Sequence, residues 1–438
     1  MKAKIFSSES FRRTALALVL VPALFSASCS RAGYEFTDFN PRNPLEDADE
    51  SAFTVTTVKV TDLADGIPED CRIPSEAETK TTSTPVNAIV ADLFEYANRG
   101  KVIEIAGKYE SFDLETGTPL TLSGKILLPK DRKPKRYILV SHYTIGSNAE
   151  APSNSFPLEG VLCDMGYAMI YPDYQGYGID SKNVHPYLVL RQTAYDVCMM
   201  FRAAGLYLKN TDYAPENPGF YLMGYSQGGA VTMATQWLWE TALGELIEDE
   251  LGKGTDIVQV FAGGGPYDVR ATYSSFITSN KVNIPCAVPL VIQGMIVGTG
   301  MDVKMDEILQ PWLYEKMDEW INSKKYTVAQ LKEIIGTTKT SDLLTAEGMN
   351  PASEPVAELY KKMTENSIVA YDWTPGAPVY MLHSMDDDVV PFVNAAKAKA
   401  KWVNGNIQYN FGHYGTHMAT ALRFIYSVKT WLKDEEGK

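Results

Sequence analysis

The sequence lacks both a cysteine pair suited to metal or redox chemistry and an excess of positive charge. It has 5 cysteines in 438 residues, none in a Cys-x-x-Cys arrangement, so a thiolate zinc site or a dithiol redox site is unsupported. Lysine and arginine number 40 against 54 aspartates and glutamates, for a net charge of -14. Because phosphate binding needs a basic face, we expect no nucleic-acid partner. Hydrophobic residues make up 45% of the chain, enough for a sizeable core.

The first 28 residues have the pattern of an export signal. Four lysines and arginines within the first 13 residues precede the apolar run Thr14–Phe25, which is too short to span a bilayer with margin. The run is followed by SASC at residues 26–29, which resembles a bacterial lipobox, where the chain is cut before a cysteine that then carries lipid. The resemblance implies lipidation of Cys29 and an outer-membrane lipoprotein of the bacterial cell envelope; a plain signal peptide is the alternative.

Export also permits disulfide bonds between the remaining cysteines. If Cys29 is lipidated, the other four can pair in three ways, and free buried thiols are an equally open interpretation. These four are Cys71, Cys163, Cys198 and Cys286.

Short apolar runs alternate with helical segments over most of the chain, which predicts an α/β fold. Two long helices are expected over 184–209 and 227–246. Most of the runs are apolar on both faces, as in parallel strands covered by helices. We therefore expect a mostly parallel eight-stranded sheet with helices on both faces. The eight predicted strands lie at 102–113, 119–128, 136–142, 167–173, 220–225, 257–262, 378–383 and 407–411.

Two stretches do not follow this alternation of strands and helices. Residues 29–85 are rich in acidic residues, Ser, Thr and Pro, and are predicted to be a tether and N-terminal extension, with a candidate edge strand at 51–63. Residues 268–372 hold amphipathic segments but no clear strand, and are too long for a loop. We predict a helical cap inserted into a catalytic domain formed by 86–267 and 373–438. Its apolar stripe from Ile292 to Leu313 could contact an acyl chain, although packing onto the body is favoured.

The sequence Gly224-Tyr225-Ser226-Gln227-Gly228 lies between a predicted strand and a predicted helix. In this context the glycines permit a sharp turn that exposes a strained serine, and the backbone N–H of Gln227 points at a developing oxyanion. We therefore predict Ser226 as a nucleophile. A structural turn is the less favoured interpretation.

A serine nucleophile needs a base that a third group orients, in the chain order Ser, acid, His. Three aspartates, 386–388, follow the strand at 378–383. This region resembles the α/β-hydrolase pattern His-Gly-x-x-Asp-x-x-Val-Pro, which places the acid on Asp387 and leaves its neighbours as turn or N-cap residues. Of two later histidines, His417 opens a helix that ends in Trp-Leu, as in secretory lipases, and is predicted as the base. His413 is then a loop residue.

The second oxyanion donor should come from the loop after the first central parallel strand. That loop reads Ser141-His142-Tyr143-Thr144, so the donor is Tyr143 or Thr144. The loop at 171–178 resembles the Asp-Tyr-x-Gly-x-Gly loop of secretory lipases and is expected to shape the floor of the site, without a catalytic role for Asp173. His185 is interpreted as a structural or surface residue.

Residues 137–433 together resemble the secretory lipase family of the α/β hydrolases. The resemblance implies hydrolysis of small-molecule, lipid or glycan esters through an acyl-enzyme on Ser226, with no metal or organic cofactor. Three alternatives remain open: an esterase that deacylates polysaccharide, a peptidase of the same fold, and a non-catalytic binding lipoprotein. The complete Ser–Asp–His order argues against the last.

Overall fold

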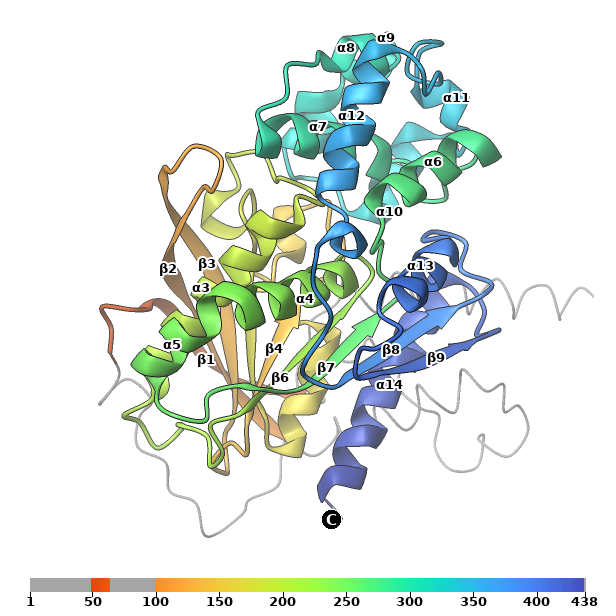
Figure 1. Ribbon diagram of the computed structural model, residues 1–438. Helices are drawn as coiled ribbons and strands as arrows, with labels where there is room; N and C mark the ends of the chain where they lie inside the picture. The colour runs from red at the N-terminus through yellow and green to blue at the C-terminus, as the bar shows by residue number, and fades with distance from the viewer. Residues whose placement is uncertain (1–48, 64–99, 437–438) are drawn as a thin grey trace, which may run out of the picture.

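The computed structural model, which describes residues 49–63 and 100–436, is built on a nine-stranded sheet (Figure 1). The strand order is β1-β2-β3-β5-β4-β6-β7-β8-β9. Strands β4 to β9 run parallel, whereas the pairs β1–β2, β2–β3 and β3–β5 are antiparallel. The strands are β1 (Thr54–Asp62), β2 (Lys101–Phe112), β3 (Pro119–Pro129), β4 (Tyr137–Ser141), β5 (Ala168–Pro172), β6 (Phe220–Tyr225), β7 (Ile257–Gly263), β8 (Val379–Ser384) and β9 (Ile407–Gly412).

The predicted mostly parallel sheet is confirmed, with one strand more than the eight expected. The additional strand is β1, which comes from the alternating stretch at 51–63 and pairs with β2 at the edge of the sheet. Part of the segment assigned to the N-terminal extension thus belongs to the sheet. The predicted signal peptide, Cys29 and Cys71 lie outside the described residues.

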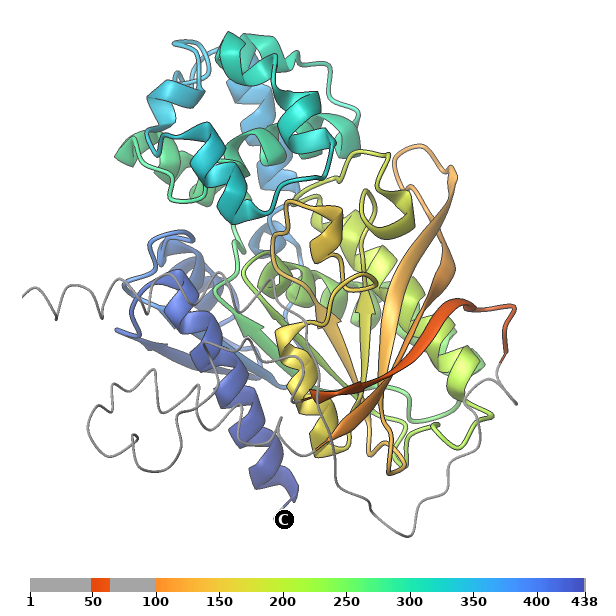
Figure 2. The ribbon, with the colours of Figure 1, turned by 180° about the vertical axis from the view of Figure 1, so that it is seen from behind.

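Helices cover both faces of the sheet. Helices α3 (Leu190–Leu208), α4 (Gln227–Leu238) and α5 (Gly244–Leu251) lie on one face. The 3-10 helix η4 (Leu158–Met165) and the last helix α14 (His417–Glu436) lie on the other (Figure 2). Side chains from the central strands therefore enter two separate cores: Leu139 of β4 packs in the first and Ile138 in the second. This double burial explains why the strands read as continuous apolar runs.

Two predicted helices have other bounds in the structure. The helix expected from Val184 begins only at Leu190, because Pro186 and a left-handed φ of 61° at Leu188 hold the preceding residues in a loop. The helix expected over 227–246 is interrupted by the π-helical turn η6 (Trp239–Leu243) and continues as α5.

The stretch at 268–372 is helical and joins β7 to β8. In Figure 1 it lies beyond the end of the sheet at which β6, β7 and β8 finish. Its helices are α6 (Val269–Ser279), α7 (Ala287–Thr299), α8 (Met305–Ile308), α9 (Pro311–Tyr314), η7 (Met317–Asn322), α10 (Val328–Ile335), α11 (Thr340–Leu343), α12 (Glu354–Glu365) and η8 (Ile368–Ala370). The remaining helices are η3 (Asn148–Glu150), η5 (Gly178–Asp180) and α13 (Val393–Lys401).

Most of the apolar stripe in this insertion packs into the core. Ile292, Leu309 and Leu313 are fully buried there, while Val297 and Trp312 are exposed. The thiols Cys163, Cys198 and Cys286 are likewise buried, and all three are free. Within the described ranges, no helix combines the length and apolar character needed to cross a membrane.

Candidate active site

Ser226 lies at the sharp turn between β6 and α4. Its φ of 60° and ψ of -126° are a sparsely populated conformation for a residue with a side chain. The flanking glycines are required by close contacts. A Cβ on Gly228 would lie 2.0 Å from the carbonyl oxygen of Ser141, and a Cβ on Gly224 would lie 2.3 Å from that of Gly228. The absence of side chains here lets α4 start directly against the end of β4.

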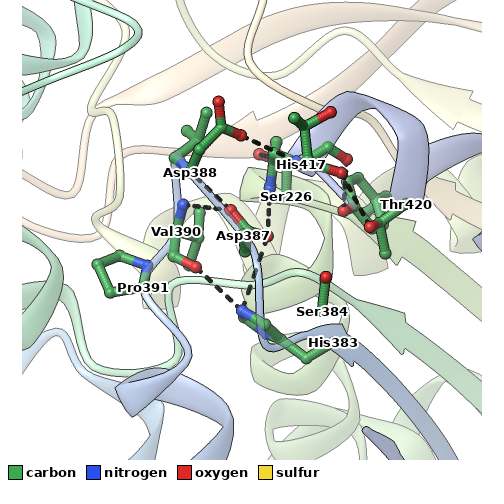
Figure 3. Close-up of polar contacts among 12 residues, drawn as sticks. Ser226, His383, Ser384, Asp387, Asp388, Val390, Pro391, His417 and Thr420 are labelled. Carbon is green, nitrogen blue, oxygen red and sulfur yellow. Dashed lines mark hydrogen bonds and ion pairs between the residues drawn. The ribbon is translucent and has the colours of Figure 1, made fainter. Parts of the chain in front are cut away.

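The three residues predicted as a triad meet at this turn (Figure 3). The hydroxyl of Ser226 lies 2.8 Å from Nε2 of His417, and Nδ1 of His417 lies 2.7 Å from Oδ2 of Asp387. Because a carboxylate accepts, Nδ1 carries the proton, which leaves Nε2 free to accept from the serine. The side chains of His417 and Asp387 are 2% and 0% exposed. Three segments distant in sequence thus form one hydrogen-bonded chain.

The surroundings of Asp387 favour its charged form. Its Oδ1 accepts the backbone N–H groups of Val389 and Val390 at 3.0 and 2.8 Å. Burial acts to raise the pKa of this carboxyl, but the neighbouring His417 and these hydrogen bonds outweigh it, so the pKa is lowered. Asp387 is therefore a fixed negative charge on the far side of the imidazole.

The neighbouring aspartates, Asp386 and Asp388, make contacts outside this hydrogen-bonded chain. Oδ1 of Asp388 accepts the backbone N–H of His417, the first residue of α14, as an N-terminal cap does. Its carbonyl and carboxylate also accept from the side chain of Asn283 in the insertion. Asp386 pairs at the surface with His413, whose side chain is 75% exposed. Neither Asp386 nor His413 bonds to the three meeting residues.

A small cavity adjoins Ser226 on the side of the predicted oxyanion donors. Ser226, Gln227 and Thr144 line it. The third candidate, Tyr143, is not among the lining residues; its carbonyl oxygen lies 2.6 Å from Nδ1 of His142. The geometry therefore brings Thr144 and Gln227 to Ser226.

The strip from His185 to Tyr187 contacts both of these residues and was missed by the sequence analysis. The hydroxyl of Tyr187 lies 2.7 Å from that of Thr144. Nε2 of His185 lies 2.8 Å from Nε2 of Gln227, and its Nδ1 lies 2.8 Å from the carbonyl oxygen of Gln175. His185 therefore donates from Nδ1 and accepts the Gln227 amide at Nε2. The sequence offered no partner motif for His185, because its partners lie on other segments.

Burial keeps His185 neutral. Removal from water, the largest effect, lowers the pKa of its imidazole to about 3. The same loop is held by Lys324 of the insertion, whose buried ammonium donates to the carbonyl oxygens of Gly176 and Asn183 at 2.7 and 2.9 Å. Burial lowers the pKa of Lys324 to about 8.

The loop after β5 packs beneath the strip from His185 to Tyr187. Asp173 is fully buried and accepts from the hydroxyl of Ser123 at 2.6 Å and the N–H of Ser153 at 2.8 Å, so it braces the loop. Gly176 and Gly178 have φ values of 84° and 61°, which glycine adopts without strain. In the part of the chain that the structure describes, no group of His, Cys, Asp and Glu has the arrangement of a metal site.

The sheet, the turn at Ser226 and the helical insertion define an α/β hydrolase. The model of the secretory lipase family matches residues 156–435, and the chain belongs to this family. It is a carboxylic-ester hydrolase of the lipase and esterase type.

Individual relatives agree with this assignment. The secreted triacylglycerol lipase LIP3 of Malassezia restricta is 23% identical over 364 residues, which cover 74% of this chain and 69% of that protein. The crystal structure of the rice cell wall degrading esterase LipA from Xanthomonas oryzae superposes with a TM-score of 0.64 and 21% identity, over 87% of this chain and 98% of that one. Candida antarctica lipase A gives a TM-score of 0.56 and 17% identity, with 74% and 75% covered.

Replacing Gly228 with alanine should disrupt the turn, because the added methyl group would overlap the carbonyl oxygen of Ser141. We expect Gly228→Ala to lower the free energy of unfolding by about 1–3 kcal/mol and to reduce kcat for ester hydrolysis, measured by urea unfolding and by a p-nitrophenyl ester assay. Gly376→Ala is the control, since its Cβ would meet nothing closer than 3.5 Å. Wild-type behaviour of Gly228→Ala would contradict the proposed crowding.

Acid should destabilise the protein partly through His185. A group whose folded pKa lies below its ordinary value of about 6.5 contributes stability that is lost as the pH falls below that value. His185→Gln keeps a donor and an acceptor but does not titrate. Between pH 7 and pH 5, the free energy of unfolding should fall in both proteins, but in His185→Gln the fall should be smaller than in the wild type by up to about 2 kcal/mol. Urea unfolding at both pH values measures this difference. An equal loss of unfolding free energy in the variant and the wild type would refute it.

Proposed function

We propose that this protein hydrolyses carboxylic esters through a covalent acyl-enzyme on Ser226, with His417 as general base and acid and Asp387 as its orienting carboxylate. The observation that carries the proposal is the chain of two hydrogen bonds, 2.8 Å from Ser226 to His417 and 2.7 Å from His417 to Asp387. A serine hydroxyl is a weak nucleophile by itself, and an adjacent base with the correct tautomer supplies the missing activation.

In the first half of the reaction, Oγ of Ser226 attacks the ester carbonyl carbon while its proton passes to Nε2 of His417. The carbonyl oxygen becomes negative and accepts from the backbone N–H groups of Gln227 and Thr144. When the intermediate collapses, the carbon–oxygen bond to the alcohol breaks, and His417 returns the proton to the departing oxygen. The acyl group stays on Ser226.

The second half repeats these steps with water. His417 removes a proton from the water as its oxygen attacks the acyl carbon, and then returns that proton to Oγ of Ser226 as the carboxylic acid leaves. Asp387 keeps the proton of the resting imidazole on Nδ1 and stabilises the imidazolium that forms in each half. The lowered pKa of Asp387 supports this role, since the carboxyl stays charged throughout.

Substitutions within the triad should separate its members from their neighbours. Ser226→Ala should lower kcat by roughly a million-fold, and Asp387→Asn by about ten-thousand-fold because the amide favours the wrong tautomer. The matched controls are Asp386→Asn and His413→Gln, which alter the pair at the surface and should retain most of the activity. The assay is p-nitrophenyl butyrate hydrolysis. Wild-type rates in Ser226→Ala would remove the basis of the proposal.

We further propose that the chain is exported and held to the bacterial envelope by a lipid on Cys29. Export is supported by the secreted relative LIP3 of Malassezia restricta. Support for the anchor comes from the sequence, where a basic start and a short apolar run precede the small residues before this cysteine. A lipid with two or more acyl chains on this cysteine would anchor the protein stably, because one chain alone binds a membrane only reversibly.

The anchor can be tested by fractionating cells. In a bacterial host, the wild-type protein should sediment with membranes, and Cys29→Ala should shift to the soluble fraction. Cys71→Ala is the matched control and should sediment like the wild type. Equal sedimentation of Cys29→Ala and wild type would exclude a lipid on Cys29.

A further inference from the structure

A small cavity adjoins Ser226, and the helical insertion forms part of its wall. Its volume is about 40 Å³. The insertion contributes one face of α6, with Val269, Tyr273 and Phe276 at helical spacing, and it adds Ala287 and Val291 from α7. These walls are mostly apolar, apart from the hydroxyls of Thr272 and Tyr273, whereas the end of the cavity next to the sheet carries Ser226 and the two proposed oxyanion residues. A ligand with one polar, reactive end and one short apolar end fits this division.

The size of the cavity limits that apolar end. A cavity of about 150 Å³ holds benzene, with its six carbon atoms, while about 10–15 Å³ is enough for one water molecule. A volume of about 40 Å³ lies near the lower end of this range, so it admits only a few heavy atoms. Longer chains would have to displace side chains from a packed wall, which costs binding energy with each added methylene.

The position of the cavity identifies which part of an ester enters it. The cavity touches Ser226, Gln227 and Thr144, but His417 is not among its lining residues. In the tetrahedral intermediate, the departing alcohol must lie at Nε2 of His417 to receive a proton, and the oxyanion lies at the backbone N–H groups. The remaining substituent on the reacting carbon is the acyl chain, which therefore occupies the cavity.

We propose that this hydrolase is specific for esters of short acyl groups, of roughly two to four carbon atoms, and that Phe276 and Val291 of the insertion set the limit. The inference rests on the proposed function, because it assigns the cavity relative to the acyl-enzyme at Ser226. The alcohol portion is not confined by the cavity, so its size has little influence on the rate.

The test is a series of p-nitrophenyl esters from acetate through butyrate and hexanoate to octanoate and laurate. For the wild type, kcat/KM should be highest for acetate or butyrate and should fall about ten-fold or more by octanoate. Phe276→Ala should enlarge the cavity and raise the octanoate-to-butyrate ratio by about ten-fold. Val291→Ala should act in the same direction with a smaller change.

Two further variants make the result specific to the cavity. Ala287→Leu adds bulk to the wall, so it should lower the butyrate rate relative to acetate. Val297→Ala is the matched control for Val291→Ala: it lies on the same helix but is 44% exposed, and its chain-length profile should equal that of the wild type. Urea unfolding of each variant shows whether it is folded, and if Phe276→Ala is not, the two α7 variants decide.

Different outcomes separate this inference from the proposed function. If octanoate and laurate are hydrolysed as fast as butyrate, and Ser226→Ala abolishes all of these rates, the short-acyl inference is wrong and the proposed function stands. If the profile is short but none of the cavity variants shifts it, the assignment to Phe276 and Val291 is wrong. If the wild type hydrolyses no ester faster than Ser226→Ala, both fail. A rate that depends on alcohol size among acetate esters, but not on acyl length, would reverse the placement of the substrate.

Discussion

The turn at Ser226 holds a serine in a conformation that costs of order 1–3 kcal/mol, and the surrounding structure must compensate for it. The backbone N–H of Ser226 donates to the carbonyl oxygen of Gly263 at 2.9 Å, which ties the turn to the end of β7. The next strand is tied in the same way, since Gly264 donates to Leu382 of β8 at 2.9 Å. Because β6, β7 and β8 are buried on both faces, the sheet is rigid enough to keep the strained turn. Ser226, Asp387 and the start of α4 all take their positions from this edge.

The positions of Gln227 and Thr144, the proposed oxyanion residues, depend on a second set of contacts, supplied by the loop between β5 and α3. One strip of that loop bonds to Gln227 through His185 and to Thr144 through Tyr187. Lys324 of the insertion then fixes the loop from above through two carbonyl oxygens. Buried polar groups without partners are costly, so each of these side chains has few alternative positions. The side chains of Gln227 and Thr144 are thus held in place without a substrate, and such preorganisation is what the proposed oxyanion stabilisation requires.

The insertion combines two roles that its sequence does not separate. Ile292, Leu309 and Leu313 build its own core, whereas one face of α6 and the start of α7 close the cavity at Ser226. Asn283, between these two helices, also donates to Asp388, which caps the helix that begins with His417. The same short region therefore contacts both the cavity at Ser226 and the segment that carries His417.

The sequence by itself determined the fold class, and it predicted Ser226 as the nucleophile with its partners in the order acid, then histidine. Continuous apolar runs require burial on both faces, and Gly-x-Ser-x-Gly between a strand and a helix has a local geometric cause. The family pattern favoured Asp387 over its neighbours and His417 over His413, and the structure brings those two to Ser226. Only the tertiary structure decided that Thr144, and not Tyr143, lies at the cavity, that His185 is buried against Gln227, and that the cavity is small. All three findings depend on the direction of loop side chains and on the residues that face them. The spacing of residues along one segment encodes neither property.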